Sequence, residues 1–250
     1  MKLIYLLSLS TFIISSCNAQ IEKDEKKQAI AIKIPEADSL MSKPIWEVSD
    51  YQKGVIVFKT IKERDEYSLL NYVKNEGKSL FERLTDFQNY EVLTVNKTKE
   101  QQFEIHTKLT DAISRLYKLF FNNQRMNGKL LLGHEMTVCF MANMALSKIN
   151  IDFINVVFPN KDSLDEVRKE GYKKVQLGTF MMISGSLITI SHDYPLYQEE
   201  DLIRLARFIK PYINSVKSFL NEDQQYEILV EINKVKNSST YPKVKKIFFD

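Results

Sequence analysis

Hydrophobic side chains recur at intervals of three and four residues along most of the chain, which is the period of amphipathic helices. The clearest stretch begins at Thr98, which has capping-box spacing to Gln101, and ends at Asn127 and Gly128. Residues 130–149 are apolar on nearly every side, so we expect a buried helix there. Helical spacing also extends through residues 69–87, 199–220 and 221–235. The sequence therefore predicts a mainly α protein.

The helices are expected to form one helical-bundle-like domain over residues 35–250. Glycine and proline number only 7 and 6 in the chain, and so few turn-forming residues favour helices over a turn-rich β-sandwich. A minor β element remains an alternative at residues 55–58, where Val-Ile-Val-Phe suits either a strand or a buried helical turn.

A long uncharged stretch marks residues 164–191 as the central element of this domain. Residues 175–191 contain no charged side chain, and Gly171, Gly178 and Gly185 recur every seven residues. Seven residues are close to two helical turns, so the three glycines would share one face of a helix. Each glycine costs a helix about 1 kcal/mol relative to alanine. We therefore predict a buried helix whose glycine face lies against another helix or a ligand.

Two other interpretations of this stretch stay open. Residues 183–191 are rich in β-branched side chains, so a hairpin could turn at Ser184, Gly185 and Ser186. The neutral run is also near the lower length limit of a membrane span. A helix is favoured because Asp162 can cap its start and Pro195 can end it.

The first residues have the pattern of a secretory signal. Lys2 precedes an apolar run over residues 3–14, which Ser15, Ser16 and Cys17 follow. Ile14-Ser15-Ser16-Cys17 resembles the lipobox of bacterial lipoproteins. The resemblance implies that residues 1–16 are removed and that Cys17 is diacylated and begins the mature chain. The alternative is ordinary cleavage after Ala19.

Residues 17–34 would then form a charged tether between the lipid and the domain. The resemblance implies a cell-envelope protein, at the outer membrane, its periplasmic face or the cell surface. Without the leader, 34 basic and 32 acidic residues leave a net charge of +2. This balance argues against a nucleic-acid partner.

Candidate chemistry is sparse. His134 and Glu135 begin a His-Glu-x-x-His zinc motif, but Val138 stands where the second histidine is required. A metal site would need this pair to converge with His192 and Asp193. The sequence has no nucleophile elbow and no glycine-rich phosphate loop, so we expect no cofactor. With Cys17 acylated, Cys139 has no partner for a disulfide and is expected to be a buried thiol.

These features favour a lipid-anchored envelope protein that binds another protein, for example one of the immunity or inhibitor type. One alternative is a lipoprotein that binds a small apolar ligand against Gly171, Gly178 and Gly185. The other is a metal-dependent enzyme that uses His134, Glu135, His192 and Asp193. Catalysis is the less favoured expectation because no catalytic motif is present.

Overall fold

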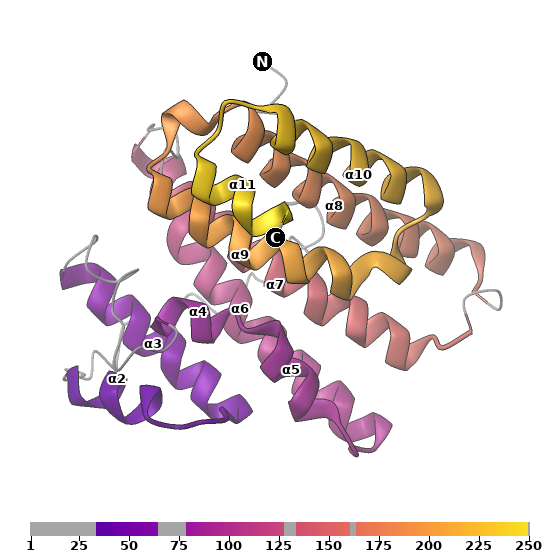
Figure 1. Ribbon diagram of the computed structural model, residues 1–250. Helices are drawn as coiled ribbons and strands as arrows, with labels where there is room; N and C mark the ends of the chain where they lie inside the picture. Colours follow the sequence, from indigo (N-terminus) through magenta and orange to yellow (C-terminus); the bar gives the residue numbers. More distant parts are fainter. Residues whose placement is uncertain (1–33, 65–78, 128–133, 161–163, 250) are drawn as a thin grey trace.

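The computed structural model describes residues 34–64, 79–127, 134–160 and 164–249, and within these ranges it is helical with no strand (Figure 1). The helices are α2 (Ile34–Met41), α3 (Val48–Arg64), α4 (Leu80–Leu84), α5 (Phe87–Thr94), α6 (Lys99–Asn127), α7 (His134–Val157), α8 (Glu166–Ser191), α9 (Glu199–Val216), α10 (Glu222–Asn237) and α11 (Pro242–Phe249). Short 3₁₀ turns, η3 (Tyr194–Leu196) and η4 (Lys217–Phe219), flank α9. The prediction of a mainly α domain is confirmed.

Helices α6 and α7 make the most extensive contact between any two helices, and they form the centre of the bundle. On one side α3 packs against α6, and the short α4 and α5 adjoin these helices. On the other side α8 and α9 pack against α7, α10 lies on α8, and α11 lies on α9 (Figure 1). One continuous apolar core extends from Ala37 in α2 to Val244 in α11.

Local sequence signals define several helix ends. The backbone N–H of Gln101 donates to Thr98 Oγ1 at 3.3 Å, and the N–H of Thr98 donates to Gln101 Oε1 at 3.0 Å, which is the predicted capping box of α6. Asn221 and Gln224 cap α10 in the same way. Helix α9 continues through Pro211, as its apolar period indicates.

Two alternatives weighed from the sequence are wrong. Residues 55–58 lie inside α3, and residues 183–191 lie inside α8, so neither forms a β element. The predicted N-cap of the uncharged helix also shifts. Asp165 is the N-cap and accepts the N–H of Arg168 at 2.8 Å, while the predicted cap, Asp162, lies outside the described residues. Within the described residues, no helix has both the length and the apolarity to cross a membrane.

Candidate functional site

The three glycines lie in α8, but the close neighbour expected beside them is missing from the described chain. A β-carbon on Gly171 or Gly178 would meet no heavy atom within 4 Å. One on Gly185 would meet the Phe140 ring at 3.8 Å, an ordinary van der Waals contact. The packed side of α8 is a different one, where Ile183 is fully buried. Among the described residues, the close helix neighbour expected at Gly171 and Gly178 is not found, and contact of this face with a ligand or a partner stays a prediction.

Beside these glycines, α8 presents an apolar outward face. Leu177 is 43% exposed and Ile188 is 37% exposed, although both are large hydrophobic residues. Met181 and Ser184 lie between them in the sequence and are partly exposed as residues, but the hydroxyl oxygen of Ser184 is buried and has no hydrogen-bond partner among the described residues. Intervals of four, three and four residues place all four side chains on one side of a helix. We call Leu177, Gly178, Met181, Ser184, Gly185 and Ile188 the α8 outer face.

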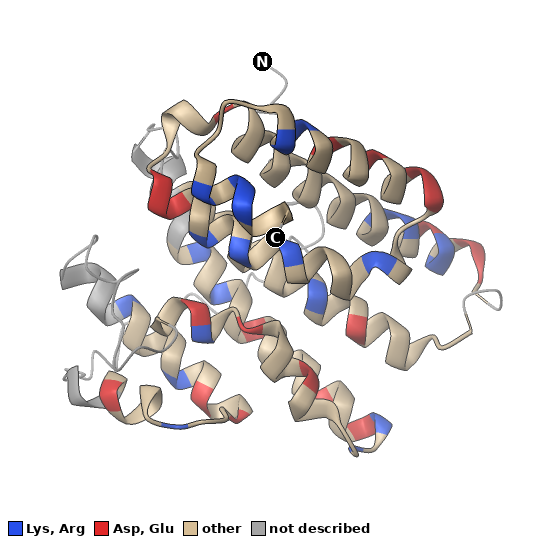
Figure 2. Ribbon diagram, in the orientation of Figure 1, with Lys and Arg blue, Asp and Glu red and all other residues tan. Residues whose placement is uncertain are grey.

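The opposite side of α8 is used inside the bundle. The hydroxyls of Ser147 in α7 and Thr179 in α8 lie 2.8 Å apart and are buried. The side-chain amide of Gln176 donates to the carbonyl oxygen of Phe219 at 2.7 Å, which ties α8 to the turn before α10. These contacts fix the rotation of α8 about its axis and hold the α8 outer face away from the core. In Figure 2 the charged positions of α8 gather in its first half, and its second half carries none.

A second candidate is a buried ionic cluster that joins α5 to α7. The Lys148 ammonium, on a side chain only 4% exposed, lies 2.6 Å from Asp152 and 2.8 Å from Glu91. Asp152 follows Lys148 by one helical turn, and Glu91 reaches the same ammonium from α5. Burial raises the pKa of Asp152, and Lys148 opposes that rise. The cluster has the geometry of a structural ion pair, in which carboxylates offset the cost of burying the ammonium.

His106 is the polar residue whose position is hardest to explain as packing. It is 4% exposed in α6, and neither ring nitrogen has a hydrogen-bond partner among the described residues. Its ring lies edge-on to Phe153, with the centroids 6.0 Å apart. Burial, and then the charge of Lys148, lower the pKa of His106 below the ordinary histidine value. The residue is therefore a neutral imidazole near neutral pH.

The proposed metal ligands are only partly described. His192 caps the C-terminus of α8, its side chain is 85% exposed, and its Nδ1 lies 2.9 Å from Asp193 Oδ1. His134 begins α7, but the side chains of His134 and Glu135 lie outside the described residues. Over the described ranges, no group of three or more His, Cys, Asp or Glu could hold a metal. Convergence of the two pairs stays a prediction.

Of the two cysteines, only Cys139 lies among the described residues. Cys139 is buried in α7, as predicted for a thiol among apolar neighbours. Cys17 lies outside the described residues, so its acylation stays a prediction.

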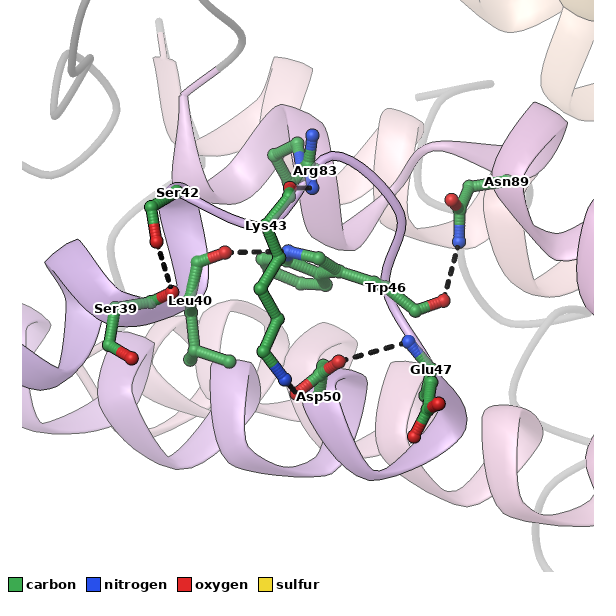
Figure 3. Close-up of polar contacts among 9 residues, drawn as sticks. All are labelled: Ser39, Leu40, Ser42, Lys43, Trp46, Glu47, Asp50, Arg83 and Asn89. Carbon is green, nitrogen blue, oxygen red and sulfur yellow. Dashed lines mark hydrogen bonds and ion pairs between the residues drawn. The ribbon is translucent and has the colours of Figure 1, made fainter.

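The lone tryptophan organises a polar joint that the sequence did not reveal (Figure 3). Trp46 is 1% exposed, and its indole N–H donates to the Leu40 carbonyl at 3.0 Å. The Asn89 side chain donates to the Trp46 carbonyl at 3.1 Å, and the Arg83 guanidinium lies over the indole, 5.2 Å from its centroid. Because Trp46 is fully enclosed, it forms part of the core and does not mark a binding face.

Asp50 completes this joint. Its carboxylate accepts from Lys43 Nζ at 2.6 Å and from the Glu47 N–H at 3.0 Å. Burial alone would raise the pKa of Asp50, but these two hydrogen bonds and the charges of Lys43 and Lys53 together lower the pKa below its ordinary value. The arrangement locks the link between α2 and α3 onto α4 and α5. We interpret it as structural.

Comparison with protein-family models, with curated proteins and with solved structures gives no match to this chain. The function of this protein is therefore inferred from the geometry of the α8 outer face and from the sequence.

Proposed function

We propose that the protein is a lipid-anchored cell-envelope protein that binds another protein through the α8 outer face. The observation that carries this proposal is the exposure of Leu177 and Ile188 in the uncharged part of α8, residues 175–191. Clustered exposed apolar residues are typical of interaction surfaces. The lipid anchor rests on the Ile14-Ser15-Ser16-Cys17 resemblance alone.

The shape of the surface favours a protein over a small molecule. Leu177 and Ile188 are eleven residues apart, which is about 17 Å along a helix axis. Small ligands generally occupy concave sites, whereas a convex helical face suits the groove or helix of a partner protein. An immunity or inhibitor type of protein is one class that works through such a surface.

The glycines gain a role in this proposal. Gly178 and Gly185 flank the line of Leu177, Met181 and Ile188, and the open space beside Gly178 lets a partner come near the α8 backbone. Helices that pack closely commonly have small residues at the point of contact. A side chain at position 178 should therefore obstruct a partner without disturbing the free protein.

The test combines this steric block with a matched control. Gly178→Leu should abolish partner binding, while Gly171→Leu should leave it intact. Both positions have no neighbour within 4 Å of a β-carbon, so both variants should fold. Gly171 lies outside the α8 outer face, between Glu170 and Tyr172.

Binding is measured by photo-crosslinking in cells from position 177, with position 226 on α10 as a second exposed site. We expect a discrete adduct from position 177 that Gly178→Leu removes and Gly171→Leu preserves. An adduct that persists in Gly178→Leu, or that forms equally from position 226, would contradict the proposed surface.

A further inference from the structure

A basic concavity lies between α9 and α11, on helices that the α8 outer face does not include. Its volume is about 390 Å³, it is open to solvent, and it is lined by Ile203, Arg207, Lys243, Lys246 and Ile247. Three of these five residues are cationic and two are aliphatic. Figure 2 shows basic positions close together on α11 and the adjoining part of α9.

The backbone that presents these cations is firmly held. Val244, in the middle of α11, is fully buried. Lys210 Nζ donates to the Ile247 carbonyl at 2.7 Å, and the Tyr241 hydroxyl donates to the Tyr197 carbonyl at 3.0 Å. The tail therefore docks on α9, and Lys243 and Lys246 are presented by a fixed helix and not by a mobile end.

Of the three cations, Lys243 and Lys246 have interactions with other residues, whereas Arg207 has none with the described ones. Lys243 Nζ lies 3.6 Å from the Glu199 carboxylate, a long ion-pair distance. The Arg207 side chain makes no hydrogen bond or ion pair with any described residue. Three cations that line one concavity repel one another, and a bound anion would offset that repulsion.

We propose that this concavity binds the phosphate headgroup of an anionic phospholipid. Arg207, Lys243 and Lys246 would contact the phosphate, since guanidinium and ammonium groups are the usual phosphate ligands of proteins. Ile203 and Ile247 would contact the less polar atoms next to it, which a free phosphate ion lacks. The combination of basic and apolar residues on one short helix is typical of surfaces that rest on a bilayer.

The proposed anchor is compatible with this site but is not required for it. Ile34 lies seventeen positions after Cys17, and an extended chain of that length reaches about 60 Å at most. A tether of this reach lets the α9–α11 side of the domain lie on the bilayer that holds the lipid. The site is also independent of the α8 outer face, so each proposal can fail alone.

The test uses residues 18–250, which keep every residue of the core and carry no acyl group or leader. The protein is sedimented with phosphatidylcholine vesicles that contain or lack phosphatidylglycerol. The test variant is Arg207→Gln with Lys243→Gln and Lys246→Gln. The control variant is Lys169→Gln with Lys173→Gln and Lys174→Gln, three exposed lysines of α8. Both variants lose three positive charges.

We expect binding only to vesicles with phosphatidylglycerol, and at least a tenfold loss in the test variant with little change in the control variant. Arg207→Gln alone should weaken binding roughly fivefold, because one basic side chain is removed. Arg207 is exposed and forms no hydrogen bond or ion pair with a described residue, so this single variant separates binding from folding.

Three outcomes would overturn the proposal. The first is equal binding to vesicles with and without phosphatidylglycerol, or binding to neither. The second is an equal loss in the test and control variants, which would mean that net charge alone governs binding. The third is binding of inorganic phosphate in the concavity, followed by nuclear magnetic resonance, without binding to the vesicles. Gly178→Leu should bind vesicles as the unaltered protein does.

Discussion

Gly54→Ala tests how tightly α3 packs against its neighbours. A β-carbon on Gly54 would lie 2.9 Å from Leu84 Cδ2 and 3.1 Å and 3.2 Å from two ring carbons of Trp46. Leu84 is fully buried and Trp46 is 1% exposed, so either side chain would have to shift within the core. The added methyl group must therefore displace well-packed side chains or shift α3.

The expected effect is the difference between two opposing contributions. Replacing glycine by alanine inside a helix stabilises it by up to about 1 kcal/mol. Forcing an extra methyl group into a filled core destabilises by about 1–3 kcal/mol, and at the distances found for Gly54 this cost should dominate. A β-carbon on Gly178 would have no neighbour within 4 Å, so only the helix stabilisation by alanine remains there. Gly54→Ala should lower the free energy of unfolding, and Gly178→Ala should raise it.

Chemical denaturation of both variants, followed by circular dichroism, measures this difference. Opposite shifts of the two midpoints at a common slope are the expected result. In a Leu84→Ala background the cost of Gly54→Ala should shrink, because the atom that clashes has been removed. If Gly54→Ala is as stable as Gly178→Ala, or if its cost is unchanged without the Leu84 side chain, the steric reasoning is refuted.

Three further predictions concern histidine, metal and lipid. His106 resists protonation when folded, so stability should fall as pH drops below its ordinary pKa of 6.5, where the unfolded chain takes up a proton first. His106→Leu should lose less stability than the control His192→Leu between pH 7 and about 5, and equal losses in urea titrations would argue against a buried neutral ring. Elemental analysis should find background zinc, and one equivalent that is lost in His134→Ala would instead favour the enzyme alternative. Cys17→Ala should leave the membrane fraction or block processing, and unchanged partition and processing would end the lipoprotein interpretation.

Local signals predicted the helices because each depends on residues that are close in sequence. The spacing of Thr98 and Gln101 specified both hydrogen bonds of the α6 capping box. The apolar period of α9 indicated that the helix continues through Pro211, and the structure has Pro211 inside α9. The start of α8 was misplaced by three residues because Asp162 and Asp165 are both suitable caps. Only the geometry distinguishes them.

Close contacts between helices were harder to predict from the sequence, because they depend on which side chains of another helix lie nearby. The regular spacing of Gly171, Gly178 and Gly185 indicated a shared face, and the structure leaves open space at the first two. Gly54 has no such pattern, yet its β-carbon position is crowded by Trp46 and by a leucine about thirty residues further on. A glycine pattern can show that a helix allows another helix to approach closely, but it does not show whether a neighbouring helix lies there.

The α8 outer face had a sequence signal that burial alone does not explain. Internal packing accounts for the buried side of the helix, where Ile183 lies. Leu177 and Ile188 are packed in part, but 43% and 37% of their surfaces stay exposed on the outward side, where charged or polar side chains are usual. The peripheral helix α10 exposes Leu229 too, but it mixes this residue with exposed charges such as Glu227. Charges scattered over exposed helix faces limit unwanted association. The outward face from Leu177 to Ile188 has no charged residue over about three helical turns. The packing of the free domain does not require this absence of charge, whereas the binding of a partner would.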